Sequence, residues 1–205
     1  MNARVLIVGA ILLVGVVVAA DHSLAKSHIA KAESQSAEFT VDPSHSVILF
    51  KIRHFGVTNF YGRVNNPTGK FLLVDEPGAS FVEIEVQTKF IDGGNDARNK
   101  FLAGPDFFNP REHPTATFKS REIKRIDEST WEAVGTFKMR GVDVPLTVQL
   151  RQYAEVSTSR FGYRAGFEAT FVVSRSTFGM TTHLEENMLS DAVEITVSVA
   201  GARAS

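Results

Sequence analysis

Residues 161–173 read FGYRAGFEATFVV, and the alternation of apolar with polar side chains in this stretch decides the class of fold. One phase carries an apolar row of Phe161, Tyr163, Ala165, Phe167, Ala169, Phe171 and Val173. The other phase carries Arg164, Glu168 and Thr170. A period of two residues indicates a β-strand with one buried side and one side facing solvent. The folded part of the chain is therefore expected to be built from strands of this kind.

Seven further segments follow the same pattern, near residues 48–54, 61–73, 82–90, 115–126, 131–139, 144–150 and 193–199. Turns of hairpin length connect several of them, and Arg140-Gly141-Val142 is an example of a tight one. Eight short strands with one apolar side each favour an antiparallel barrel or sandwich. The fold class predicted from the pattern is all-β.

One segment between the third and fourth strands breaks the pattern. Asn95 is expected to cap a short helix that runs through Phe101 or Leu102. The following stretch, Asp106–Pro114, contains two prolines and is unsuited to a central strand. It is predicted to be a lid-like loop at one end of the barrel, where Phe107 and Phe108 plug the opening or fold over it.

The amino-terminal residues predict targeting rather than folding. Arg4 precedes an uncharged apolar run from Val5 to Ala20, which is typical of a cleavable secretory signal peptide, with an uncleaved anchor as the alternative. Cleavage is expected after Ala20 or Ala25 and leaves no stable membrane span. Residues 21–38 are predicted to be a flexible tether, and residues 39–201 a single barrel domain located in the periplasm.

The composition excludes several classes of function. The 205 residues are 43% hydrophobic and 22% charged, as in soluble globular proteins. The formal net charge of −1 provides no general attraction to nucleic acid. The chain has no cysteine, which excludes disulfides, thiolate catalysis and cysteine-ligated metals. Its 16 phenylalanines provide a large apolar aromatic surface to bury.

Motifs that carry chemistry are absent from the sequence. It has no G-x-S-x-G, Walker, G-x-G-x-x-G, H-E-x-x-H or EF-hand motif. Gly93-Gly94 with Arg98 lacks the Lys-Ser/Thr ending of a phosphate-binding loop and is interpreted as a turn. Strand alternation places His45 and His54 on opposite faces, so no metal site and no cofactor are predicted. His54 ends an inward apolar row and offers a polar tip near a mouth of the barrel.

Several short motifs occur in order between Phe39 and Gly201. They are Asp42-x-x-His45-Ser46 before Val47–Gly56 and Gly62, then Asp106-Phe107-Phe108, Pro114-x-x-x-Phe118, Gly135-x-x-x-x-Arg140-Gly141 with Pro145, and Ser174–Gly179. In order and spacing they resemble the YceI-like family of periplasmic polyisoprenoid-binding proteins. The resemblance implies a lipocalin-like, eight-stranded antiparallel barrel that holds a long isoprenoid in its core. The chain differs from the family pattern in having Ser176-Thr177 where many members have an acidic residue before Phe178-Gly179.

The predicted function is that of a non-catalytic carrier for an isoprenoid lipid, either a polyprenyl chain or an isoprenoid-quinone tail. Twelve residues are predicted to bind it, nine from apolar strand phases together with His54 and the two lid phenylalanines: Ile48, Phe50, Ile52, His54, Val82, Ile84, Val86, Phe107, Phe108, Phe137, Phe167 and Phe171. No catalytic residue is predicted.

Two other classes of function stay open at this stage. A hydrolase or isomerase acting on an apolar substrate would need a polar cluster inside the barrel, for which His54 is the candidate. A structural or interaction module would have a filled core. Small inward residues such as Ala133, Gly135, Ala165 and Ala169 are compatible with tight packing and with a tunnel. A homodimer is also left open.

Overall fold

The row that defines the fold class forms the strand β11, Gly162–Ser174, in a computed structural model that describes residues 38–203. Its inward side chains Ala165, Phe167 and Ala169 are buried, whereas Thr170 on the other phase is exposed. The prediction of a one-sided strand is confirmed over this part.

The start of the row differs from the prediction. Phe161 and Tyr163 are exposed, because Gly162 has a φ of +67° and forms part of a turn that projects beyond the barrel. The guanidinium groups of Arg160 and Arg203 cover the two rings, each at 5.1 Å from the ring centroid. Cation–π contacts therefore replace burial at this position.

The described residues contain these elements in chain order: β1 Phe39–Val41, η1 Pro43–His45, β2 Val47–His54, β3 Thr58–Val64, β4 Thr68–Leu72, β5 Phe81–Gln87, η2 Thr88–Phe90, β6 Ile91–Asp92, α1 Asp96–Leu102, β7 Thr115–Arg125, β8 Thr130–Met139, β9 Val142–Gln152, β10 Val156–Thr158, β11, η3 Arg175–Phe178 and β12 Leu189–Arg203. The η elements are short 3₁₀ helices. None of the helices among residues 38–203 is long and apolar enough to cross a lipid bilayer.

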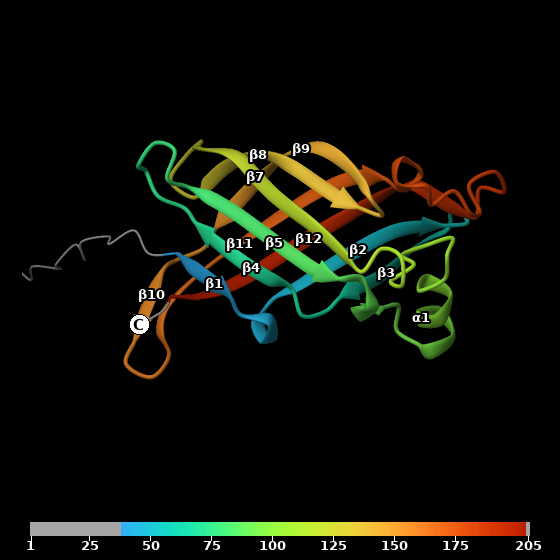
Figure 1. The fold of residues 1–205 in the computed structure, drawn as a ribbon, viewed down its shortest axis with the longest axis horizontal. Coiled ribbons are helices and arrows are strands. Elements are labelled where there is room, and N and C mark those ends of the chain that lie inside the picture. The colour runs from blue at the N-terminus through green and yellow to red at the C-terminus, as the bar shows by residue number, and fades with distance from the viewer. Residues whose placement is uncertain (1–37, 204–205) are drawn as a thin grey trace, which may run out of the picture. The chain divides into compact units, whose positions relative to one another are not determined.

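The strands close into an antiparallel barrel of eight positions (Figure 1). β12 pairs with β2 over one part of its length and with β1 over another, so β1 and β2 act as one strand interrupted by η1. In the same way β3 with β4, and β5 with β6, continue one another around the wall. β7, β8, β9 and β11 follow, and pairing of β11 with β12 closes the barrel. The predicted eight-stranded barrel is confirmed.

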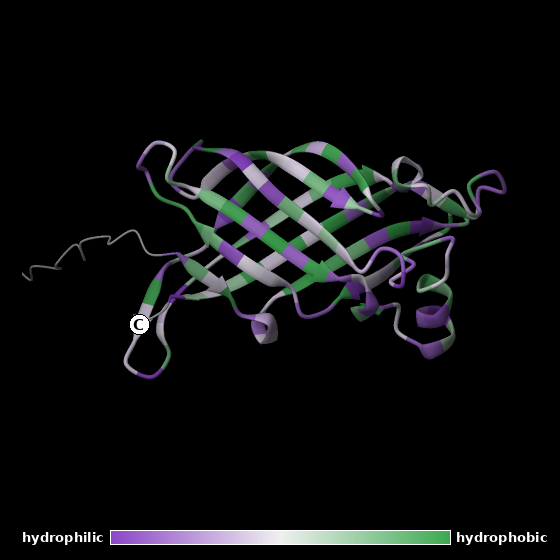
Figure 2. Cartoon of the chain, in the orientation of Figure 1, coloured by the Kyte–Doolittle hydropathy of each residue, from purple (hydrophilic) through white to green (hydrophobic). Residues whose placement is uncertain are grey.

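Hydropathy alternates along the barrel strands as bands of green and purple in Figure 2. The third predicted strand ends earlier than its sequence pattern indicates, because residues 88–90 form η2. The Thr88 hydroxyl donates a hydrogen bond of 2.6 Å to the His113 carbonyl, and the Thr88 N–H donates to the Pro114 carbonyl. These two bonds turn the chain inward at Thr88 and leave Phe90 exposed.

The short helix α1 begins where the sequence predicts. The Asn95 side chain accepts a hydrogen bond from the Arg98 N–H at 2.8 Å, which caps the helix. The helix ends at Leu102, with Ala103 as its C-cap residue. The predicted lid-like loop follows at the same end of the barrel (Figure 1).

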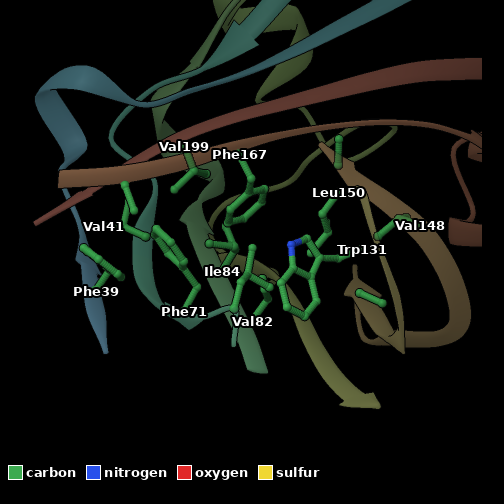
Figure 3. Packing of buried hydrophobic residues seen from close by; sticks show 14 residues of the cluster. Phe39, Val41, Phe71, Val82, Ile84, Trp131, Val148, Leu150, Phe167 and Val199 are labelled. Carbon is green, nitrogen blue, oxygen red and sulfur yellow. The ribbon is translucent and has the colours of Figure 1, made fainter. Parts of the chain in front are cut away.

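The opposite end of the barrel is filled with side chains, and we call it the filled end. Phe167 meets the Phe71 ring edge-on at 5.1 Å between centroids, and Phe71 stacks on Phe39 at 5.3 Å. Trp131 and Leu150 complete this core (Figure 3). The Trp131 indole N–H donates to the Gln152 side chain at 2.8 Å, so its polar atom is satisfied.

The predicted signal peptide and almost all of the predicted tether lie outside the described residues. Glu38 is the first described residue, and its carboxylate pairs with Lys70 at 2.5 Å.

Candidate functional site

The other end of the barrel encloses a cavity of about 540 Å³, and we call it the hollow end. Its wall is formed by inward-facing side chains of the barrel strands, with contributions from α1, the lid-like loop and the segment before β12. The volume lies in the range of sites that bind small organic ligands. Most lining residues are aliphatic or aromatic, so the cavity suits an apolar molecule.

Partial exposure of inward-facing residues shows that the space is hollow. Phe50, Phe171 and Ile195 point into the barrel and line the cavity, but they are only half-buried. Phe167, at the cavity floor, is 1% exposed. The floor is completed by Val82 and Leu150, each also 1% exposed, which belong to the core of the filled end.

All twelve residues predicted to contact a ligand lie on the wall of this one cavity. They come from β2, β5, β8, β11 and the lid-like loop, which are distant in sequence. Within the lid-like loop, Phe107 packs on Phe101 at 4.7 Å between centroids and Phe108 faces Phe50 at 6.3 Å. The structure thus brings the twelve together, and ligand contact by each of them stays a prediction.

Polar side chains gather at the mouth of the cavity, and we call this group the rim. It consists of side chains from the β2–β3 turn, α1 and the segment between η3 and β12: His54, Thr58, Asn59, Arg98 and His183. His54 is the residue that the sequence predicts near the mouth. Arg98 and His183 are not part of that prediction.

Ring contacts and a hydrogen bond connect the rim on the α1 side. The Arg98 guanidinium lies 4.6 Å from the centroid of the Phe60 ring and donates a hydrogen bond to the Gly93 carbonyl. Phe101 follows Arg98 by three residues and lies on the same side of the helix. The Phe101 ring stacks on His183 with 6.3 Å between centroids.

The rim is also connected on the β12 side. The His183 carbonyl accepts hydrogen bonds from the N–H groups of Met188 and Leu189, both at 3.2 Å. Leu189 pairs with His54, and His54 pairs with Thr58 across the β2–β3 turn. The rim residues therefore surround one opening.

Two arginines hold the segments around the mouth in place. Arg140 donates hydrogen bonds to the carbonyl groups of Phe178, Pro105 and Phe107, and so joins η3 to the lid-like loop. Arg175 is 2% exposed and donates to the carbonyls of Ser190, Met180 and Leu189 at 2.9, 2.6 and 3.1 Å.

Burial shapes the electrostatics beside the cavity. Desolvation lowers the pKa of Arg175, and the nearby charge of Asp191 counteracts this in part. Desolvation also acts to raise the pKa of Asp191. Hydrogen bonds from the Ser176 N–H and hydroxyl, both 2.8 Å, outweigh it together with the Arg175 charge, so the pKa of Asp191 lies below its usual value.

Among the described residues that line the cavity there is no aspartate, glutamate, serine or lysine. The inward Thr88 hydroxyl and the Arg175 guanidinium are engaged by backbone carbonyls. Within residues 38–203 no three potential metal ligands of the His, Cys, Asp or Glu type lie together. His45 lies in η1 rather than in a strand, and its ring is hydrogen-bonded to Asp42 at 2.9 Å.

Sequence reasoning missed two kinds of lining residue. Val193, Ile195 and Val197 lie on the inward phase of β12 and carry the same alternation signal as the residues that were chosen. Arg98 and His183 lie outside the strands, where no periodicity reveals their direction. Only their placement in the fold brings them to the mouth.

The fold and cavity define a closed antiparallel barrel with an internal apolar site, and comparison with known proteins gives its family. The YceI-like domain model matches residues 39–200, so the chain belongs to the YceI-like family. A UPF0312 protein of Pseudomonas paraeruginosa is 32% identical over 174 residues, which cover 83% of this chain and 90% of that protein.

Two solved structures share the fold. BcnA of Burkholderia cenocepacia has a TM-score of 0.70 at 18% identity and covers 78% of this chain and 98% of its own. A polyisoprenoid-binding domain from Saccharophagus degradans has a TM-score of 0.64 at 13% identity and covers 83% of this chain and all of its own, 100%.

Proposed function

We propose that this protein binds and carries a long apolar isoprenoid lipid, a polyprenyl chain or the tail of an isoprenoid quinone, in the cavity of its hollow end. The observation that carries the proposal is the cavity of about 540 Å³ with its aliphatic and aromatic wall. Family membership and the likeness to a polyisoprenoid-binding domain support the same ligand class.

The cavity size and the hydrophobic effect make this function energetically reasonable. A water molecule occupies about 30 Å³ in the liquid, and we take the same volume for each carbon of a lipid chain. A cavity of 540 Å³ then accommodates roughly 18 carbons, or three to four five-carbon units. Burial of each five-carbon unit contributes about 4 kcal/mol at roughly 0.8 kcal/mol per carbon. Three to four units therefore contribute roughly 12–16 kcal/mol, compared with an association cost of about 4–15 kcal/mol.

Binding without catalysis fits the chemistry of the cavity better than an enzymatic reaction does. Proton transfer or nucleophilic attack needs an acid–base pair or an activated nucleophile close to the substrate. The lining offers histidines only at the rim, and no carboxylate beside them in the lining. A hydrolase or isomerase is accordingly the weaker alternative.

The test is native mass spectrometry of protein purified from a bacterial periplasm, followed by organic extraction. We expect a bound species that yields a prenyl lipid on extraction. Added polyprenol or long-tailed quinone should raise the melting temperature of delipidated protein. Absence of an extractable prenyl lipid together with no thermal stabilisation would refute the proposal.

A pair of substitutions on one strand separates cavity binding from surface adsorption. Ile52→Asp introduces a carboxylate into the apolar wall, where it lacks solvation, and should abolish lipid retention. Leu49→Asp introduces the same group on the outer side of β2, where Leu49 is 41% exposed, and should leave retention unchanged. Equal loss in both variants would indicate adsorption to the outside.

We further propose that the protein acts in the periplasm after removal of its signal peptide. The support is the uncharged run from Val5 to Ala20 behind Arg4. Amino-terminal sequencing of periplasmic protein should begin near Asp21 or Lys26. Protein that retains Met1 and fractionates with the membrane would instead identify an anchor.

A further inference from the structure

We infer that the hairpin formed by β10 and the start of β11 binds the surface of an anionic phospholipid bilayer, so that the filled end of the barrel faces the membrane. This hairpin, residues 153–164, contributes no residue to the cavity wall and none to the buried core of the filled end. The inference goes beyond the proposed function, because it concerns the outer surface of the protein and not the contents of its cavity.

The hairpin exposes large apolar and aromatic side chains. They are Tyr153, Val156, Phe161 and Tyr163, with exposed fractions of 51%, 49%, 58% and 40%. Among the described strands, β10 pairs only with β11, and the hairpin extends away from the barrel (Figure 1). Two-stranded hairpins are only marginally stable alone in water, and clusters of exposed apolar side chains mark interaction surfaces. The hairpin therefore has the character of a docking element.

The apolar side chains occupy the tip and both faces of the hairpin. Val156 is paired with Arg164 across the two strands. Tyr163 precedes Arg164 in its strand and therefore points to the opposite face from Val156. Phe161 lies in the turn that joins the strands. A folded protein partner would cover one of these faces, whereas the head-group region of a bilayer surrounds an inserted hairpin on all sides. The placement therefore favours a bilayer.

Arginines provide attraction to anionic lipids. The hairpin contains Arg160 and Arg164 but only one acidic residue, Glu155. Arg203 of β12 adds a further charge, with its guanidinium 5.1 Å from the centroid of the Tyr163 ring. Among the described residues, no carboxylate forms an ion pair with Arg160 or Arg203. Arginines beside aromatic rings suit the interface of an anionic membrane, where the rings enter the apolar boundary and the charges meet the head groups.

Contacts within the hairpin hold its tip in shape before any bilayer is bound. The Phe161 N–H donates a hydrogen bond of 2.9 Å to the Thr158 hydroxyl, and Nε of Arg164 donates to the Phe161 carbonyl at 3.1 Å. Arg164 also pairs with Asp42 at 3.3 Å, which connects the hairpin to the start of η1. The Arg160 guanidinium lies 5.1 Å from the centroid of the Phe161 ring. Because the tip is preorganised, little conformational entropy is lost when it binds.

The amino-terminal part of the sequence joins the barrel at the same end. Phe39 of β1 pairs with Arg203 of β12. The preceding residue of β12, Ala202, pairs with Arg164 of the hairpin. The uncharged run from Val5 to Ala20, for which membrane targeting is proposed above, precedes Phe39 in the chain. The hairpin thus lies at the end of the barrel that is nearest, along the chain, to this run.

The first experiment measures co-sedimentation of the purified mature protein with lipid vesicles. One set of vesicles contains equal parts of phosphatidylglycerol and phosphatidylcholine, and the other contains phosphatidylcholine alone. We expect binding to the anionic vesicles that weakens as the salt concentration rises, and much weaker binding to the neutral ones. No binding, or equal binding to both sets, would refute the inference.

Matched substitutions assign the binding to the hairpin. Arg160→Gln should weaken binding to anionic vesicles about fivefold, which is typical of one arginine near such a surface. Phe161→Ala should weaken it about tenfold, since the inserted ring is lost. The control Arg53→Gln removes an exposed charge from β2 at the hollow end and should have little effect.

Two results with these variants would contradict the inference. If Arg53→Gln weakens binding as much as Arg160→Gln, the vesicles adsorb to the protein without regard to the hairpin. If the hairpin variants leave vesicle binding unchanged but alter the oligomeric state in gel filtration, the hairpin is a contact with a second copy of the chain.

A pair of labels tests which end of the barrel faces the bilayer. Because the chain has no cysteine, a single introduced one can carry an environment-sensitive dye. Ser159→Cys places the dye at the tip of the hairpin, and Val57→Cys places it on the β2–β3 turn of the hollow end, where Val57 is 81% exposed. Anionic vesicles should shift the emission to shorter wavelength for Ser159→Cys and leave it unchanged for Val57→Cys. The reverse result would show that the mouth of the cavity faces the membrane and would refute the inference, whereas the proposed lipid cargo is tested separately by extraction.

Discussion

Two phenylalanines on inward strand phases show how the two ends of the barrel differ. At the filled end, Phe167 is 1% exposed and is packed edge-on against Phe71 at 5.1 Å. At the hollow end, Phe50 has the same inward direction but is half-buried, with Phe60 and Phe108 more than 6 Å away, at 6.1 and 6.3 Å. The same alternating pattern therefore builds a solid core and a cavity wall in one barrel.

At each end of the barrel a phenylalanine ring lies against a glycine, and the direction of that ring accounts for part of the difference in filling. Phe50 pairs with Gly62 on β3, and a Cβ atom at Gly62 would overlap the Phe50 ring. The glycine thus lets the ring lie along the wall rather than project across the barrel. At the filled end, a Cβ at Gly201 would come within 2.5 Å of the Phe71 ring, which fills the centre together with Phe167.

The largest expected effect is at the floor. Phe167→Ala should lower the free energy of unfolding by about 3–5 kcal/mol, because the surrounding filled core leaves a void. Urea denaturation followed by Trp131 fluorescence measures this loss. A loss below that of an equivalent change at the hollow end would contradict the division of the barrel into two ends.

A smaller loss is expected at the mouth. Arg175→Met removes the donors to three carbonyl groups around the cavity and should cost about 2–3 kcal/mol. The control is Arg63→Met, which breaks an exposed ion pair with Asp92 and should cost about 0–1 kcal/mol. Equal losses in urea denaturation would show that Arg175 does not brace the mouth.

Changes at the cavity wall should affect binding more than stability. Phe50→Ala is expected to cost only about 1–2 kcal/mol in the lipid-free protein, because the ring already borders empty space. It should enlarge the cavity and shift binding towards bulkier chains. Gly62→Ala should push the ring inward and weaken binding of every prenyl chain. Calorimetry with a series of prenyl chains of different bulk tests both variants. If Phe50→Ala and Gly62→Ala change the affinity for bulky chains in the same direction, the account of Gly62 is refuted.

The smallest effect concerns acid stability, which one carboxyl group at each end of the barrel is used to test. The pKa of Asp42 at the filled end is held below its usual 3.8 mainly by the hydrogen bond from His45, and that of Asp191 at the hollow end is also lowered. A depressed pKa stabilises the fold above the ordinary value, and this stabilisation is lost as the pH falls through the folded-state value.

Each carboxyl is expected to contribute of the order of 1 kcal/mol. Asp42→Asn and Asp191→Asn should each reduce the drop in urea midpoint between about pH 5 and about pH 3. Wild-type protein with the same midpoint at both values would contradict the contribution of these groups.

The sequence predicts which residues form the barrel wall, but it does not predict how far their side chains fill the interior. Alternation in rows such as Val82, Ile84 and Val86 determines which side chains point inward, and all three line the cavity. The pattern carries no information on how much of the interior those side chains fill. Ala133, for example, is fully buried in the core of the filled end, to which Trp131 and Leu150 also belong.

The rim was beyond sequence reasoning for a different reason. Arg98 and His183 lie 85 positions apart in segments without a repeating pattern. Both line the same cavity because α1 and the segment before β12 lie at the same end of the barrel, where Phe101 of α1 stacks on His183. Gly93-Gly94 was interpreted as a turn, which the structure has there. That interpretation did not indicate the position of the nearby Arg98 guanidinium, which is hydrogen-bonded to the Gly93 carbonyl.

The floor formed by Phe167, Val82 and Leu150 has a kinetic consequence. A chain that enters a cavity closed at its inner end has to withdraw through the opening by which it came. A second lipid therefore binds only after the first has dissociated, so the exchange of bound lipid follows a dissociative mechanism. The rate at which a labelled prenyl chain is replaced should equal its rate of spontaneous release and stay constant as the concentration of competing lipid increases.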